Sequence, residues 1–188
     1  GQSHILQYNY QDRLIINMGY SYHYNSIGGA IINNTIASNS YSIRFNFESA
    51  GNIMYALSKA TNIRKNNDGE YAILGIPYAQ YVKGEFDFSK NIRIDHRNSF
   101  AFHIGMGIAV PYGNAKTIPF EKQYFSGGAN SVRGWTVRDL GPGSFVRDEN
   151  TNLLDQSGDI KLDASIEYRS KLFWKFQGAI FVDAGNIW

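Results

Sequence analysis

The sequence is as informative in what it lacks as in what it contains. None of its 188 residues is cysteine, which excludes disulfides and thiolate metal sites. No run approaches the roughly 18 apolar residues of a membrane helix, which excludes a helical membrane protein. The formal net charge of +2 shows neither the basic surface of a nucleic-acid-binding protein nor an acidic tail. We therefore expect no nucleic-acid partner.

Histidine is scarce, and its distribution does not indicate an active site. His4, His23, His96 and His103 lack the spacing of metal ligands. They also lack the clustered nucleophile that a hydrolase would need, which weakens the hypothesis of an outer-membrane hydrolase. We expect no metal, no cofactor and no catalytic residue, so that the chain is not an enzyme. No signal peptide is visible and Gly1 does not look like a native start, so we expect a fragment of a longer protein.

Aromatic residues and glycine are plentiful, with Tyr 13, Phe 12 and Gly 19 against Pro 4. This composition suits the lipid-facing bands, interfacial girdles and crowded interior of a membrane β-barrel. Apolar and polar residues alternate with period two in six segments, which predicts six strands. The strands are expected at 14–24, 41–50, 78–88, 98–111, 160–169 and 174–185.

The charged residues of these segments fall on the face opposite the apolar ones. They include Arg44, Glu48, Lys83, Glu85, Asp87, Glu167 and Arg169. A soluble sandwich also alternates, but it seldom concentrates so many charges opposite aromatics, so the pattern favours a transmembrane barrel. The residues expected to face lipid are Leu14, Ile16, Phe45, Phe86, Ile104, Ile166 and Val182. The residues expected in the periplasmic girdle are Tyr20, Tyr22, Tyr24, Trp174 and Phe176.

Short and long connections alternate along the chain, as they do in outer-membrane barrels. Residues 95–99 and 170–171 form short turns, which predicts a periplasmic location, and the segment 25–40 belongs to the same side. Residues 51–77 and 112–157 are long and rich in Gly, Asn and Asp, which predicts extracellular loops. No helix with recognisable caps is expected. The fold class is therefore all-β, an antiparallel meander with a long loop that enters the lumen.

The loop 112–157 contains the most informative stretch, residues 125–135. Arg133 follows small residues, including Gly127 and Gly128, and precedes Gly134, which we expect to permit tight packing around the guanidinium. Asp183 lies in a mostly apolar strand, where an unpaired charge is costly. The planar fork of arginine can bond two carboxylates at once. Glu167 and Asp183 lie on consecutive strands at different distances from the turn, so direct opposition is not expected.

These residues resemble the BamA/TamA superfamily of outer-membrane assembly barrels. Val132, Arg133, Gly134 and Trp135 match its loop motif, with Trp in place of the usual Phe or Tyr. Glu167 and Arg169 match its Glu-x-Arg strand motif. Phe181, Asp183 and Gly185 match its Gly-x-x-Phe-x-Asp-x-Gly motif. The resemblance implies that the loop arginine contacts the strand Glu and Asp. It also implies a 16-stranded barrel, of which these six would be strands eight to thirteen, and POTRA domains absent from this chain.

The loop run from Gly127 to Trp135 and the segment from Leu140 resemble the TamA branch, especially its lipoprotein form TamL. The resemblance implies an outer-membrane factor that helps insert or export β-barrel and envelope proteins by strand addition at a barrel seam. Its partners would be outer-membrane lipid, client proteins, and periplasmic or inner-membrane assembly proteins. Two alternatives stay open: a two-partner secretion transporter of the same superfamily, and a passive porin in which Arg133 is a constriction charge.

Overall fold

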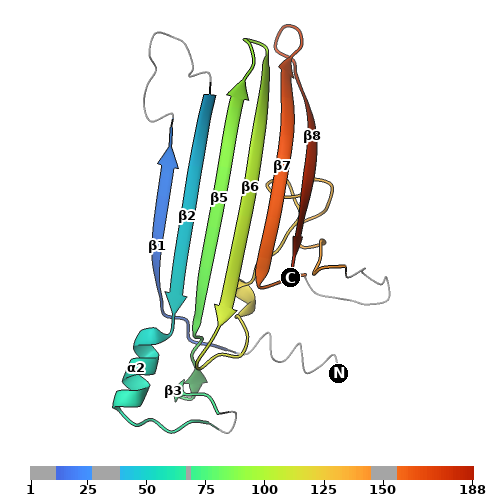
Figure 1. Ribbon diagram of the computed structural model, residues 1–188. Helices are drawn as coiled ribbons and strands as arrows, with labels where there is room; N and C mark the ends of the chain where they lie inside the picture. Colours follow the sequence, from blue (N-terminus) through green and yellow to red (C-terminus); the bar gives the residue numbers. More distant parts are fainter. Residues whose placement is uncertain (1–11, 27–38, 67–68, 145–155) are drawn as a thin grey trace. The chain divides into compact units, whose positions relative to one another are not determined.

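The computed structural model describes residues 12–26, 39–66, 69–144 and 156–188. Six strands form one antiparallel meander sheet in the order β1-β2-β5-β6-β7-β8 (Figure 1). Their bounds are β1 Asn17–Asn25, β2 Asn39–Ala50, β5 Tyr81–Arg93, β6 Asn98–Pro111, β7 Ile160–Lys171 and β8 Gln177–Ile187. Among the described residues, no helix is long and apolar enough to cross a membrane.

Four smaller elements accompany the sheet. They are the helix α2 (Asn52–Ala60), the strands β3 (Ala72–Ile73) and β4 (Ile76–Pro77), and the 3-10 helix η1 (Phe120–Lys122). The chain divides into two compact units, and each is considered by itself. Unit 1 comprises residues 1–20, 47–84 and 108–123, and unit 2 comprises residues 21–46, 85–107 and 124–188.

Unit 1 corrects the prediction of a long loop over 51–77, because the helix α2 lies within this segment. Gly51, in the left-handed conformation at φ 78°, ends the path of β2 and starts α2 without a side-chain cap. A Cβ at this position would lie 2.3 Å from the carbonyl oxygen of Ala79, so the turn requires glycine. The helix escaped prediction because it lacks the Ser, Thr, Asp or Asn cap by which helices are recognised.

A polar cluster around Glu48 holds the elements of unit 1 together. Asn17 Nδ2 and the Tyr81 hydroxyl donate to Glu48 Oε1 at 2.6 and 2.5 Å. Lys122 Nζ, from η1, donates to the same oxygen at 2.7 Å. One carboxylate on β2 therefore joins β1, β5 and the segment that follows β6. The sequence placed Glu48 on the polar face but gave no indication of these partners.

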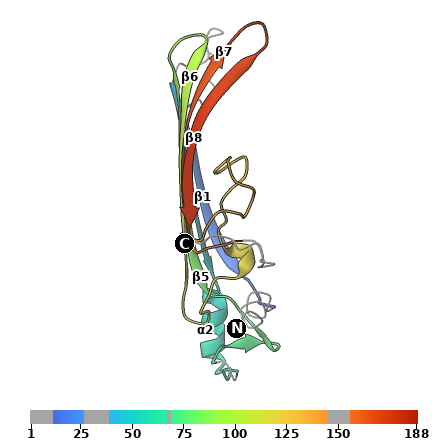
Figure 2. The ribbon, with the colours of Figure 1, turned by 90° about the vertical axis from the view of Figure 1, so that its right-hand side faces the viewer.

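In unit 2 the sheet has two unlike faces. On β6 the side chains of Ile104 and Met106 are exposed, whereas the alternating Gly105 and Gly107 are buried. On β7, Ile166 is exposed and Asp163 is 3% exposed. The apolar face carries no packed element from the described part of the chain, whereas the loop segment 124–144 lies along the other face (Figure 2). This arrangement follows from period-two alternation, since neighbouring residues of a strand point to opposite faces.

Several strand limits differ from those predicted. The first strand begins at Asn17, and Leu14 makes only a parallel bridge with Tyr78. The third long strand is β5, which begins at Tyr81 and continues to Arg93. Residues 89–93 were missed because polar side chains interrupt the alternation there. The β2, β6 and β7 ranges lie within two residues of those expected.

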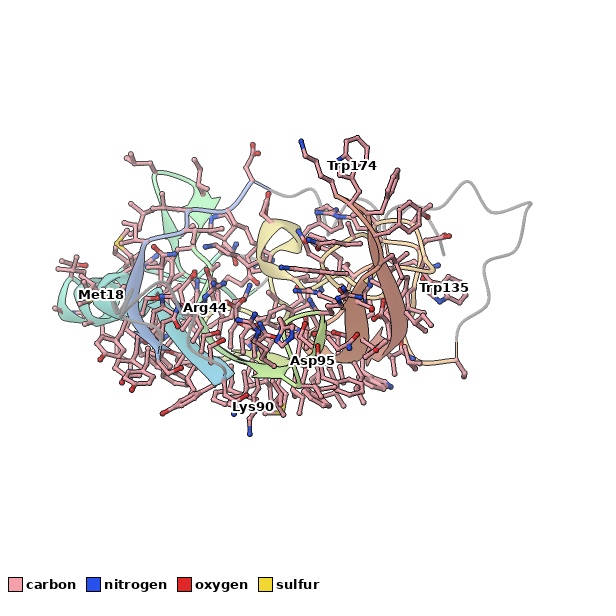
Figure 3. The ribbon with its side chains drawn as sticks, turned by 90° about the horizontal axis from the view of Figure 1, so that it is seen from above. Met18, Arg44, Lys90, Asp95, Trp135 and Trp174 are labelled. Carbon is pink, nitrogen blue, oxygen red and sulfur yellow. The ribbon has the colours of Figure 1, made fainter. Side chains whose placement is uncertain are left out.

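The last hairpin needs the largest correction. Its turn lies at 172–176, beyond the predicted Ser170–Lys171, and β8 begins only at Gln177. The Leu172 N–H donates to the Phe176 carbonyl at 3.0 Å, and Trp174 takes a positive φ of 51°. Trp174 is 85% exposed and projects from the turn (Figure 3). The start of this apolar turn was predicted to be a strand because Leu, Phe and Trp are residue types expected in a membrane-spanning strand.

Candidate functional site

The site is built on the hairpin of β7 and β8 in unit 2. Glu167 pairs across the hairpin with Phe181, and Ser165 pairs with Asp183. Glu167 and Asp183 are therefore diagonal neighbours on one face, two positions apart, and are not directly opposite. Diagonal neighbours on a face lie about 7–8 Å apart, which a long side chain inserted between them can bridge. The hairpin presents two carboxylates to one cation.

Arg133 occupies that position from the loop that follows β6. Its Nε donates to Asp183 Oδ2 at 2.7 Å, and its Nη2 donates to Asp183 Oδ1 at 2.6 Å. The Arg133 backbone N–H donates to the same Oδ2 at 3.0 Å. This carboxylate therefore holds both the side chain and the main chain of the loop. Arginine can form this parallel pair of hydrogen bonds with one carboxylate, whereas lysine cannot.

The second carboxylate completes the coordination of the guanidinium. Arg133 Nη1 donates to Glu167 Oε2, and Arg169 Nε donates to Glu167 Oε1 at 2.5 Å. The guanidinium carbon of Arg133 lies 3.6 Å from the ring centre of Phe181, within the range of a cation–π contact. Phe181 and Glu167 are a cross-strand pair, so one pair supplies both an aromatic surface and a charge.

Burial strengthens these contacts. The side chain of Asp183 is 4% exposed, that of Glu167 is 13% exposed and that of Arg133 is 24% exposed. The hydrogen bonds to Asp183, followed by those to Glu167, raise the pKa of Arg133 above its usual range. The two carboxylates therefore favour the charged form of the guanidinium. The arrangement is an electrostatic clasp between a loop and a hairpin, and we call it the Arg133 clasp.

Glycines let the loop fold tightly and approach the hairpin. Gly127 and Gly128 have positive φ values of 98° and 89°. A Cβ on Gly127 would lie 2.1 Å from the Thr136 carbonyl oxygen. A Cβ on Gly185 would lie 2.9 Å from Asp163 Cβ and 3.0 Å from Val132 Cγ2. These three positions accept no larger side chain without movement of their neighbours.

The other motif residues differ in their surroundings. Val132 is 7% exposed and packs at Gly185. Gly134 was expected to permit tight packing, but a Cβ added there would meet nothing within 4 Å and its φ is not positive. Trp135, which takes the place of the usual Phe or Tyr, is 49% exposed and lies at the outer edge of the loop (Figure 3). Neither residue therefore takes part in the clasp.

Sequence reasoning missed a second contact between the same loop and the sheet. Asp163 lies on β7, and its side chain is 4% exposed. Ser131 Oγ donates to Asp163 Oδ2 at 3.4 Å, and Lys161 Nζ lies 3.7 Å from Oδ1. A Cβ on Gly105 would lie 2.5 Å from Asp163 Oδ1. The one available signal was an acid between Leu162 and Ala164, the same pattern that singled out Asp183.

An aromatic contact supports the start of the loop. Tyr124 lies over Gly107 of β6, where a Cβ would be 2.6 Å from the ring carbon Cζ. The Tyr124 N–H donates to the Gly158 carbonyl at 2.8 Å, which ties the beginning of the loop to its end. Gly107 thus leaves room for the ring of Tyr124 on the covered face of β6. The loop can take this position only because residue 107 has no side chain.

Comparison with known proteins identifies the family. Residues 17–188 match the model of the Omp85 superfamily domain. The chain belongs to the Omp85 superfamily. Over 92 residues it is 36% identical to the outer membrane protein assembly factor BamA of Neisseria meningitidis serogroup B. That similarity covers 44% of this chain and 11% of the relative, so the chain spans a small part of the protein that it matches.

Membership of the Omp85 superfamily fixes location and general class. Proteins of the superfamily reside in the outer membrane of the Gram-negative envelope. They are assembly factors and not enzymes. Among the described residues, no group of three or more His, Asp or Glu side chains could hold a metal ion.

Proposed function

We propose that this chain is part of the membrane barrel of an Omp85 assembly factor, which helps insert β-barrel proteins or export envelope components. The Arg133 clasp carries the proposal. A loop arginine held by two largely buried carboxylates would brace the hairpin of β7 and β8 from the inside. The exposed apolar face of the sheet would then meet lipid.

The proposed mechanism is strand addition at a seam of the barrel. An unstable strand edge pairs its main-chain groups with those of a client strand and so guides the client into the membrane. The six strands of this chain would form the stable wall opposite that process, within a 16-stranded barrel that includes further strands. The clasp would keep the wall rigid while the seam opens. Periplasmic domains would deliver the client.

The passive porin is the weaker hypothesis because of the way Arg133 is used. A constriction charge faces the open pore, where it can attract or repel ions. All three side-chain donor groups of Arg133 point to Asp183 or Glu167. The contacts therefore favour a brace over a selectivity filter. Within the superfamily, the loop run from Gly127 to Trp135 supports a TamA-type member, in its lipoprotein form, as the finer proposal. Acylation of the native full-length protein, read by mass spectrometry, tests that part.

The test of function is client assembly in cells depleted of the wild-type protein. The full-length Arg133→Ala and Asp183→Ala variants should still insert into the outer membrane but reduce the amount of folded client protein. Thr136→Ala is the matched control, because Thr136 is exposed in the same loop. Normal client assembly by both clasp variants at normal protein levels would overturn the proposal.

A further inference from the structure

The helix α2 exposes the side that helices normally bury. Ile53, Ala56, Leu57 and Ala60 recur at the helical spacing of three, four and seven residues, and all are exposed. Ile53 and Leu57 are each 52% exposed. The buried residues of the helix are Met54 and Ser58. A surface helix of a soluble protein turns its apolar stripe toward the core. Here the stripe has no partner within the described residues.

The chain places this helix at the end of a strand. α2 begins at Asn52, two residues after β2 ends at Ala50. β2 has 12 residues, and a tilted strand of about 9–11 residues crosses the hydrocarbon core of a membrane. If β2 crosses the membrane as proposed, a helix that starts directly after it starts at the level of the lipid headgroups. It follows β2 into one of the long connections, which the proposed topology assigns to the extracellular side.

The charges next to the stripe are all of one sign. Lys59, Arg64 and Lys65 are exposed, and residues 52–66 contain no Asp or Glu. Lys59 Nζ lies 4.9 Å from the ring centre of Tyr55, and Lys65 Nζ lies 5.1 Å from that of Tyr71. The two rings form an edge-to-face pair with centres 5.9 Å apart. Tyrosine and lysine together are typical of a membrane interface, where an apolar body meets a polar tip.

We propose that α2 is a membrane-surface anchor that binds the outer leaflet of the bilayer. Its apolar stripe, centred on Ile53 and Leu57, enters the boundary between headgroups and acyl chains. Lys59, Arg64 and Lys65 bind the phosphates of the lipid headgroups. The inference rests on the proposed membrane placement of the strands. The chemistry favours lipid over a second protein, because lysine is depleted at the centres of protein interfaces, whereas interfacial helices combine basic and apolar residues.

Because the chain contains no cysteine, a single introduced cysteine can be labelled specifically to test the proposal. A single Leu57→Cys substitution in the full-length protein, with any thiol outside this chain replaced, carries a polarity-sensitive fluorophore. The protein is reconstituted in phosphatidylcholine vesicles with or without phosphatidylglycerol, each containing doxyl-labelled lipid as quencher. We expect a blue-shifted emission at Leu57 that the lipid quencher removes, and stronger quenching when phosphatidylglycerol is present.

Two controls separate the inference from the proposed function. Ile166→Cys, on the exposed apolar face of β7 and 50% exposed, reports lipid contact of the sheet. Glu121→Cys, an exposed acid of η1, reports water. If Ile166 is quenched and Leu57 behaves like Glu121, the anchor is wrong and the membrane placement stands. If neither is quenched, the placement itself is wrong.

The charge component is tested by replacing Lys59, Arg64 and Lys65 with Gln in the Leu57→Cys protein. We expect the additional quenching due to phosphatidylglycerol to be lost. If that increment stays unchanged, the proposed phosphate contacts are wrong. A blue shift at Leu57 that depends on protein concentration and does not respond to the lipid quencher would show that a second copy covers the stripe, which also overturns the proposal.

Discussion

Asp183 accepts three hydrogen bonds from Arg133, two from the guanidinium and one from the backbone N–H. Because Asp183 comes from a strand and Arg133 from a loop 50 residues earlier, this pair ties the loop to the sheet. The backbone contact does not depend on the identity of residue 133. A substitution of the arginine therefore removes part of the interaction, and a substitution of the aspartate removes all of it.

Loss of the guanidinium should destabilise the folded protein substantially. We expect Arg133→Ala to lower the free energy of unfolding by about 3 kcal/mol, because it leaves buried carboxylates without their charged partner. Arg133→Lys should recover only part of the loss, since an ammonium group cannot form the parallel pair of bonds. The urea midpoint of the full-length protein in detergent micelles measures both. Lys116→Ala, at an exposed position, is the control and should change little.

Exchange of the charges tests whether the contact is direct. Arg133→Glu and Asp183→Arg should each reduce stability and client assembly, and the double variant should restore a part of both. Full restoration is not expected, because the backbone N–H of residue 133 loses its carboxylate acceptor. If the double variant is as impaired as the sum of the two single variants, the residues do not interact in the working protein.

The alternation of apolar and polar residues was sufficient to predict most of the sheet. It located β2, β6 and β7 well, because their exposed apolar residues alternate without interruption with glycine or polar residues. The prediction failed where a turn is made of apolar residues or a strand of polar ones. The turn 172–176 consists largely of apolar residues, and the end of β5 consists largely of polar ones. In both places the residues lie beyond the packed part of the sheet, so their sequence need not alternate between apolar and polar side chains.

The residues of the site could be predicted from the sequence, but their arrangement in space could not. A carboxylate in an apolar strand, an arginine among small residues and the family resemblance together predicted a contact of Arg133 with Glu167 and Asp183. The register of the hairpin could not be derived, because it depends on the turn, which was predicted at 170–171 and lies at 172–176. Asp163 was missed because the loop residue that contacts it, Ser131, carries no charge.

Two glycines of the matched motifs should respond oppositely to alanine. Gly185→Ala brings a Cβ to within 2.9 Å of the Leu162 carbonyl oxygen and of Asp163 Cβ, and overpacking of this kind costs roughly 1–3 kcal/mol. Gly134→Ala meets open space and needs no positive φ, so it should be neutral or slightly stabilising. Urea midpoints of the two variants check this contrast. Equal losses would mean that the loop packs differently around Gly134.

The short turn between β5 and β6 gives a prediction about pH. The side-chain amide of Asn98 donates to Asp95 Oδ2 at 2.8 Å, and the backbone N–H groups of Arg97 and Asn98 donate to Asp95 Oδ1 at 2.6 and 2.8 Å. These bonds, that of the Asn98 side chain first, lower the pKa of Asp95 below its usual value. Because the pKa of Asp95 is lower in the folded protein than in the unfolded one, the ionised carboxylate stabilises the fold at pH values above the unfolded pKa. This stabilisation is lost as the pH falls through the folded pKa.

Asp95→Asn should therefore be less stable than the wild type near neutral pH, and the difference should shrink as the pH falls below about 3.9, the usual pKa of an aspartate. Urea midpoints of both proteins in the same detergent, measured across that range, provide the test. Lys175→Gln, in the other short turn, removes a charge without removing a turn acceptor and serves as the control. A wild-type advantage that grows as the pH falls would contradict the prediction, because it would mean that the protonated aspartate stabilises the turn.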